Sequence, residues 1–173
     1  MYLFGQDNCG INKPDLQFFE ELFESTKKHK NIVELGTWLG FTAMYFGIVT
    51  SLRDGWCITF DIRDNRFKKI IPLWTPNITF IEVDLLHTPP QNIVKDAIGR
   101  ENCIIFVDNG SKLRELQTLT PYIHKENLVV IHDVDVQFPE SEILSVNGWV
   151  MNVERANRAK EIGSACRLLT YGG

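Results

Sequence analysis

The sequence predicts a doubly wound α/β protein: a mainly parallel sheet with helices on both faces, in one compact domain over residues 1–173. Strand-like apolar runs alternate with helical patterns along the chain, which favours parallel strands joined by right-handed crossovers. The runs 103–107 (CIIFV) and 128–131 (LVVI) are apolar without alternation, as in a sheet covered on both faces. Residues 31–42 (NIVELGTWLGFT) are typical of a strand, a glycine turn and a helix start.

The elements follow in a regular order. An amphipathic helix is expected over about 14–28, where apolar residues recur at helical spacing and Pro14 stands near the start. Five strands then alternate with four helices. The strands are expected near 31–35, 56–61, 78–84, 103–108 and 128–135, and the helices near 40–52, 65–73, 90–98 and 111–124. Beyond residue 135 we expect a strand at 149–153, a short helix at 156–161 and a last strand at 165–171, forming an antiparallel edge.

Composition excludes several classes of protein. A chain of 173 residues with 44% hydrophobic content suits one core. The net charge of −4, without a long Lys/Arg run, argues against nucleic acid as a partner. The four cysteines are far apart in the sequence, which indicates a reducing, cytoplasmic setting. The uncharged stretch 35–52 is rich in glycine and threonine, so a strand plus helix explains it better than a membrane span, and the N-terminus lacks a signal pattern.

The turn after the first predicted strand is the first candidate site. Gly36 and Gly40 lack side chains where a ligand would approach the backbone, and Thr37 belongs to the same turn. The spacing differs from the G-x-G-x-x-G of dinucleotide sites because Trp38 takes the place of the middle glycine. A nicotinamide dinucleotide is therefore disfavoured, and the turn taken alone is also compatible with plain architecture.

An acid closes each of five predicted strands. The carboxyl ends of parallel strands meet at one edge of the sheet, where ligands of such folds bind. A single acid there often only ends a strand or caps a helix, whereas five in series indicate a ligand site. These acids are Glu34, Asp61, Asp84, Asp108 and Asp133.

Each acid has a use if the ligand is an adenosyl compound. Asp61 is placed to accept hydrogen bonds from two ribose hydroxyls, although capping the next helix is an alternative that Asp64 could also fulfil. Asp84 could accept from the exocyclic amine of adenine, or simply belong to a turn. Glu34 could hold an ammonium through water or backbone contacts, or complement a helix dipole.

In this order the motifs resemble those of class I S-adenosylmethionine-dependent methyltransferases. VELGTWLGFTA is similar to their first motif, ITFDIRD to the acid after the second strand and NITFIEVDLL to the third motif. The segment 104–135 resembles the small-molecule O-methyltransferase branch, which includes the macrocin and catechol-type enzymes and the cephalosporin hydroxylase-like proteins. The resemblance implies a Rossmann-like domain with an N-terminal helix in 1–30, a cofactor-binding core in 31–135 and a reduced C-terminal part in 136–173.

The resemblance also implies an enzyme that moves a methyl group from S-adenosylmethionine to an oxygen or nitrogen of a small polar acceptor. Its cofactor-binding residues would be Glu34, Gly36, Thr37, Gly40, Asp61 and Asp84. Its catalytic residues would be Asp108, His132 and Asp133, with Lys112 and Asp135 as further candidates. Asp108 and Asp133 could also hold Mg²⁺ or another divalent metal, or serve without metal as a base or as turn caps. Where the branch usually has a second acid or an acid-histidine pair just after the strand-four aspartate, this chain has Asn109-Gly110-Ser111.

Two other functions stay open. The first is a module that binds S-adenosylmethionine without methyl transfer, which the small acceptor region supports. The second is an enzyme that acts on S-adenosylmethionine itself or on another nucleotide in the same crevice. The expected partner is a small molecule, with no nucleic acid and no membrane. The apolar pairs Phe18-Phe19 and Leu22-Phe23 would allow a homodimer through the first helix.

Overall fold

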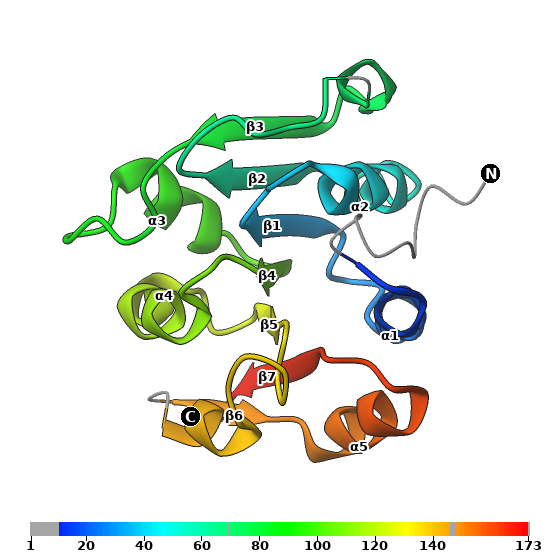
Figure 1. Cartoon of the computed structure of the whole chain (residues 1–173), viewed down its shortest axis with the longest axis vertical. Coiled ribbons are helices and arrows are strands. Elements are labelled where there is room, and N and C mark those ends of the chain that lie inside the picture. The colour runs from blue at the N-terminus through cyan, green and yellow to red at the C-terminus, as the bar shows by residue number, and fades with distance from the viewer. Residues whose placement is uncertain (1–10, 69, 146–147, 173) are drawn as a thin grey trace.

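The centre of the fold is a seven-stranded sheet in the order β3-β2-β1-β4-β5-β7-β6 (Figure 1). The computed structural model describes residues 11–68, 70–145 and 148–172. β1 to β5 pair in parallel, whereas β7 pairs antiparallel with both β5 and β6. The predicted fold class, a mainly parallel sheet with helices on both faces, is confirmed.

The strand predictions hold closely in the parallel half of the sheet. The strands are β1 (Asn31–Leu35), β2 (Cys57–Asp61), β3 (Ile78–Glu82), β4 (Cys103–Val107), β5 (Leu128–Ile131), β6 (Trp149–Met151) and β7 (Arg167–Tyr171). The prediction that the last strand forms the edge is wrong, because β7 lies between β5 and β6, and β6 takes the edge. β5 also ends before His132, so the predicted strand at 128–135 is too long.

Helices cover both faces of the sheet. In Figure 1, α1 (Lys13–Ser25), α2 (Phe41–Ser51) and α5 (Val153–Ile162) lie on one face, and α3 (Asn92–Ile98) and α4 (Lys112–Leu119) lie on the other. Three 3₁₀ turns complete the described elements: Ile71–Leu73, Thr120–Tyr122 and Glu140–Ser145. Within the described residues, no helix is both long and apolar enough to span a membrane.

The helix expected at 65–73 is wrong. Of the described residues in this segment, only Ile71–Leu73 are helical, as a 3₁₀ turn that contains Pro72. Arg66 instead pairs with Asp64 and stacks over the rings of Trp74 and Phe80. A proline disfavours an α-helix through the preceding turn, and the side-chain contacts of Arg66 fix the segment as a loop.

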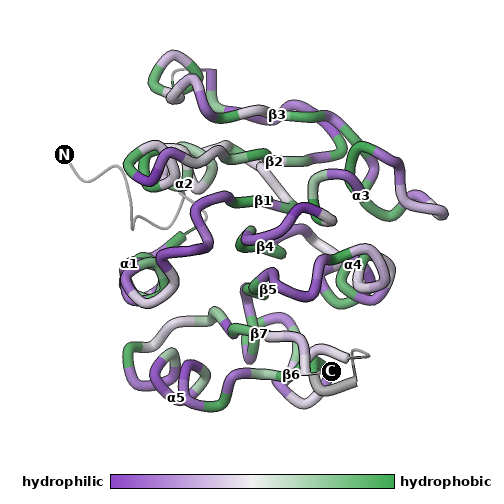
Figure 2. Tube along the Cα trace, turned by 180° about the vertical axis from the view of Figure 1, so that it is seen from behind, coloured by the Kyte–Doolittle hydropathy of each residue, from purple (hydrophilic) through white to green (hydrophobic). Residues whose placement is uncertain are grey.

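The apolar side of α1 belongs to the core. Phe18, Phe19, Leu22 and Phe23 are all at most 5% exposed. Figure 2 shows that apolar residues concentrate in the central strands, against which these helices pack. The aromatic pairs that suggested a homodimer are therefore buried within one chain and offer no apolar surface to a second copy.

The cysteines in the described part of the chain are reduced and buried. Cys57, Cys103 and Cys166 carry free thiols, and burial raises the pKa of each of them. Cys9 lies outside the described residues. These thiols behave as small apolar side chains, as the wide sequence spacing predicts.

The carboxyl end of β1 touches the carboxyl end of β4. Gly36 has φ +109°, and a Cβ placed on it would lie 2.7 Å from the backbone nitrogen of Asn109 and 2.8 Å from the carbonyl carbon of Asp108. From the sequence, we expect a glycine here because a ligand would approach the backbone at this position. The structure adds a requirement of the fold itself, since the backbone of Asp108 and Asn109 comes too close to Gly36 to leave room for a side chain.

Gly36→Ala should therefore destabilise the protein more than a substitution at an uncrowded glycine of similar φ. We expect a loss of roughly 2–4 kcal/mol in the free energy of unfolding, from left-handed strain plus overpacking. Gly163 is the matched control, because it has φ +76° and an added Cβ there would meet no neighbouring atom within 4 Å. Gly163→Ala should cost about 1–2 kcal/mol in the same urea titrations, from strain alone. If both substitutions lowered the free energy of unfolding equally, the close contact of Gly36 with the backbone of Asp108 and Asn109 would be refuted.

Candidate functional site

The carboxyl ends of the parallel strands bring most of the predicted site residues to one edge of the sheet. Leu35 of β1 is in register with Phe60 of β2 and with Val107 of β4, and Val107 is in register with Ile131 of β5. The residues that follow these positions therefore lie side by side across four strands. They include Gly36, Asp61, Asp108, His132 and Asp133.

Backbone strain concentrates at the same edge. Among the described residues, five that are not glycine have positive φ, and three of them lie here: Trp38 (φ 44°), Asp133 (φ 59°) and Asp135 (φ 65°). Such conformations cost of order 1–3 kcal/mol each and cluster at functional sites. This strain marks the edge as a site held in shape by its surroundings.

Asp61, the last residue of β2, holds the glycine turn that follows β1 (residues 36–40). Its Oδ2 accepts a hydrogen bond of 2.8 Å from the backbone N–H of Trp38, and the side chain is nearly buried. No α-helix follows it directly in the described residues, and Asp64 is occupied by Arg66, so the helix-capping alternative for Asp61 is removed. The Oδ1 of Asp61 accepts no hydrogen bond from the described residues and stays available to a ligand.

Glu34 and Thr37 lie inside the protein under the same turn. Thr59 donates its hydroxyl to Glu34 Oε2, and the hydroxyls of Thr37 and Thr59 are 2.5 Å apart. Glu34 is fully buried, and this burial raises the pKa of its carboxyl well above the usual range. Glu34 therefore shapes the turn, and any effect of it on a ligand passes through the backbone.

Asp84 stands apart from the other acids. It lies two residues beyond β3, is exposed, and accepts a hydrogen bond of 2.9 Å from the backbone N–H of Leu86. That contact is the turn role that the sequence left open. Its proposed contact with adenine stays a prediction.

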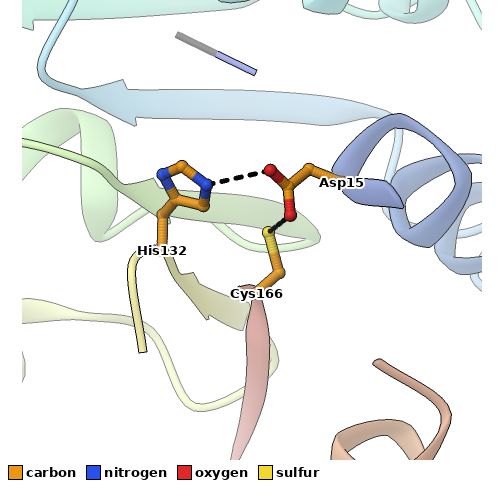
Figure 3. Close-up of side chains that lie close together, drawn as sticks. All are labelled: Asp15, His132 and Cys166. Atoms are coloured by element: carbon orange, nitrogen blue, oxygen red, sulfur yellow. Dashed lines mark hydrogen bonds and ion pairs between the residues drawn. The ribbon is translucent and has the colours of Figure 1, made fainter. Parts of the chain in front are cut away.

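A hydrogen-bonded chain connects Asp108 to α1 through His132. The Nδ1 of His132 lies 2.9 Å from Asp108 Oδ1. Its Nε2 lies 3.0 Å from Asp15 Oδ2, as Figure 3 shows. The other oxygen of Asp15 accepts from the Ser164 hydroxyl at 2.7 Å, and Cys166 Sγ lies 3.7 Å from it. The imidazole is thus held at both nitrogens by acids from different parts of the chain.

The charge of His132 follows from these contacts. Burial alone would lower the pKa of His132, but the hydrogen bonds to Asp108 and Asp15 raise it to about 10. Burial likewise favours a higher pKa for Asp15, yet the hydrogen bonds from His132, Ser164 and the backbone of Ala165, together with the charge of His132, outweigh it and lower the pKa. At neutral pH His132 is therefore an imidazolium that donates both N–H groups, and it has no lone pair with which to accept a proton.

Asp15 is the residue that sequence reasoning missed. It lies 117 positions from His132 in the chain, yet it is fully buried against it. A signal was present, because Asp15 shares the buried stripe of α1 with Phe19 and Leu22 at helical spacing. An acid on an apolar stripe requires a buried partner.

Lys112 lies between the two predicted metal-binding acids. Its Nζ is 2.8 Å from Asp133 Oδ2 and 3.3 Å from Asp108 Oδ1, and the residue is 4% exposed. Gln137 supports the arrangement by donating its Nε2 to Asp133 Oδ2 at 2.8 Å. Ligand atoms of Asp108, His132 and Asp133 all lie within 4.8 Å of one another, so the donors could form a metal set if Lys112 were elsewhere.

Asp135 does not join this cluster. Its Oδ2 accepts a hydrogen bond of 2.8 Å from the guanidinium of the buried Arg167, which also binds Glu140. The suggestion that Asp135 lies near the transferred group is therefore not supported, because a structural ion pair holds it toward β7.

An open cavity adjoins Lys112. Its volume is about 290 Å³, and its lining includes Gly110, Lys112, Gln137 and Phe138. A small molecule in this cavity would lie next to Lys112 and to Gln137, the residue that supports Asp133. The cavity is a candidate place for an acceptor.

Glu115 is a second buried acid that the sequence did not single out. It is fully buried on α4, and neither carboxyl oxygen has a hydrogen-bond partner of good geometry in the described residues. Burial raises its pKa to about 7, although Asn109 and Lys112 nearby oppose this shift. Its carboxyl group is destabilising to the fold whenever it is ionised.

Comparison with known proteins identifies the fold. No family model and no curated protein matches the chain. Among solved structures, CmcI with SAH is 16% identical (TM-score 0.66, 92% of this chain and 76% of that chain). CmcI with Mg and SAM is 15% identical (TM-score 0.67, 94% and 72%), and the SAH-bound methyltransferase PaMTH1 of Podospora anserina is 15% identical (TM-score 0.56, 92% and 79%). At these identities the likeness establishes the fold, which is the one that the sequence resemblance predicts.

Replacing Glu115 by the neutral Gln should stabilise the protein at neutral and higher pH. An acid whose pKa is raised in the folded state contributes stability below its unfolded value, here near 4.5, and loses it as pH rises through about 7. We expect equal stability of wild type and Glu115→Gln near pH 4, and a gain of about 3 kcal/mol for the variant above pH 7. Urea unfolding across this pH range measures both, with Glu82→Gln at an exposed acid of β3 as control. A pH-independent difference between Glu115→Gln and wild type would contradict the assigned titration.

Proposed function

We propose that the protein binds S-adenosylmethionine at the edge formed by β1, β2, β4 and β5, and transfers its methyl group to an oxygen or nitrogen of a small polar acceptor. The observation that carries the proposal is the placement of Asp61 beside the Gly36 turn, with the acids Asp108 and Asp133 on the neighbouring strands. That solved structures of the same fold hold SAH, or SAM with Mg, supports the choice of ligand.

The glycine turn and Asp61 would hold the adenosyl part. Asp61 uses Oδ2 for the N–H of Trp38, so Oδ1 is free to accept from the ribose hydroxyls. Trp38 and Gly40 both take left-handed conformations in this turn, and Gly40 is buried against the Trp74 side chain. Asp84 would accept from the adenine amine, while Glu34 and Thr37 would act indirectly by supporting the turn from inside.

Asp108 and Asp133 would serve the reacting group. The bound sulfonium supplies an activated methyl group, so the protein needs to align the acceptor and remove its proton. We assign the proton-accepting role to Asp133, because its side chain is 22% exposed, against 16% for Asp108, and contacts Lys112 and Gln137, which line the cavity. As the acceptor oxygen or nitrogen bonds to the methyl carbon, its proton would pass to the Asp133 carboxylate.

His132 would then have a positioning role. Because its pKa is raised to about 10 by its acid partners, it is protonated before the reaction starts and cannot act as the base. Its N–H groups orient Asp108 and tie the site to α1. The catalytic role that the sequence suggested for His132 is thus replaced by an indirect one.

Asp61→Ala should weaken the binding of S-adenosylhomocysteine by roughly ten- to a hundredfold in titration calorimetry, since a charged hydrogen-bond acceptor contributes about 1.5–3 kcal/mol. Asp64→Ala is the matched control, because Asp64 pairs with Arg66 on the same loop and should leave affinity unchanged. If Asp64→Ala were the variant that loses binding, Asp61 would not be the ribose ligand.

Asp133→Asn should lower the rate of methyl transfer by about a hundredfold or more while leaving the affinity for S-adenosylhomocysteine within about twofold. The rate is measured in single turnovers with the acceptor that a panel of hydroxyl and amine compounds identifies. Asp96→Asn, at an exposed acid of α3, should match wild type. Tight ligand binding without transfer to any acceptor would favour the alternative of a binding module.

A further inference from the structure

The ammonium of Lys112 stands where a divalent metal would bridge Asp108 and Asp133. It contacts one oxygen of each acid, at 3.3 Å and 2.8 Å, from a side chain that is 3% exposed. A buried ammonium is costly unless acids pair with it, so these contacts are what keeps Lys112 in the interior.

Its place in the helix strengthens this argument. Lys112 is the first residue of α4, at the positive end of the helix dipole, where a cation is disfavoured. A lysine at such a position would normally extend into solvent. Its burial toward Asp108, one turn earlier in the chain, indicates that the acid pair attracts it more strongly than the helix end repels it.

The carboxylate oxygens that face the Lys112 ammonium already accept hydrogen bonds from other residues. Asp108 Oδ1 is contacted by His132 Nδ1 as well as by Lys112, and Asp133 Oδ2 is contacted by Gln137 Nε2 as well as by Lys112. A hard divalent cation needs six or more oxygen ligands close to it, at about 2.0–2.6 Å, and a cation bound to these two oxygens would share them with an ammonium. Two cations within such a distance repel each other.

The next candidate ligand is also turned away. Asn109 follows Asp108, and its Oδ1 accepts a hydrogen bond of 2.9 Å from the N–H of Gly110. The amide oxygen thus closes its own turn. The donor set of this chain does not fit a divalent metal as long as Lys112 is in place.

We infer that Lys112 is the resident cation of the Asp108 and Asp133 pair, so that the site works without a divalent metal and admits one only when Lys112 is removed. The inference rests on the proposed function only in assigning both acids to one site. Its test measures metal binding directly. The inference can therefore fail while the proposed methyl transfer is correct, and the proposed methyl transfer can fail while the inference is correct.

The experiment measures Mn²⁺ binding by electron paramagnetic resonance on the intact protein, with wild type and the Lys112→Met variant, in which an apolar chain of similar length replaces lysine. Wild type should bind Mn²⁺ weakly, and Lys112→Met should bind it about tenfold more tightly or better. Adding Asp133→Asn to Lys112→Met should remove the gain. Arg114→Met, which deletes an exposed positive charge on the same helix, is the control and should behave as wild type.

Lys112→Arg keeps a cation at the position and should bind Mn²⁺ as weakly as wild type, so it tests the inference if Lys112→Met fails to fold. Wild-type binding as tight as that of Lys112→Met would overturn the inference. So would a metal-binding gain of equal size in Arg114→Met, because general electrostatics would then explain it.

Discussion

Three carboxylates and two cations, all buried or half-buried, form a connected chain of ion pairs at the ends of β4 and β5. Much of the structure around these strand ends depends on this chain. Asp15, Asp108 and Asp133 supply the negative charges, and His132 and Lys112 supply the positive ones. A buried charge that loses its partner costs several kcal/mol, so each member depends on the others. Through them α1, β4, β5, α4 and the segment before β7 are tied to a single point in the interior.

This cluster sets the geometry of the site before any ligand arrives. The cluster fixes Asp108 at the end of β4. The backbone of Asp108 packs closely against Gly36, which is the first residue of the glycine turn. Asp61 holds the same turn from the side of β2. The glycine turn and the acid pair are therefore parts of one edge of the sheet, and in the proposed function this edge would align the two reactants.

The parallel strands could be predicted from the sequence because each is a short, continuous apolar run, and the five acids could be placed because parallel strands end at one edge. What the acids do could not be predicted. Glu34 and Asp61 are both acids at strand ends, but Glu34 points into the protein and Asp61 toward the turn. Asp15 is recognisable in the sequence as an acid on the buried stripe of α1, but its partner His132 lies 117 positions away, and no local pattern shows that the two residues meet. The helix predicted at 65–73 is wrong because the contacts of Arg66 override a weak helical pattern.

A crystal structure with S-adenosylhomocysteine would test the central claim most directly. The account predicts the ribose hydroxyls within hydrogen-bond distance of Asp61 Oδ1, the sulfur above the end of β1 toward Asp133, and the Lys112 ammonium still between Asp108 and Asp133. A ligand bound away from Asp61, or a metal between the two acids with Lys112 turned out, would contradict it.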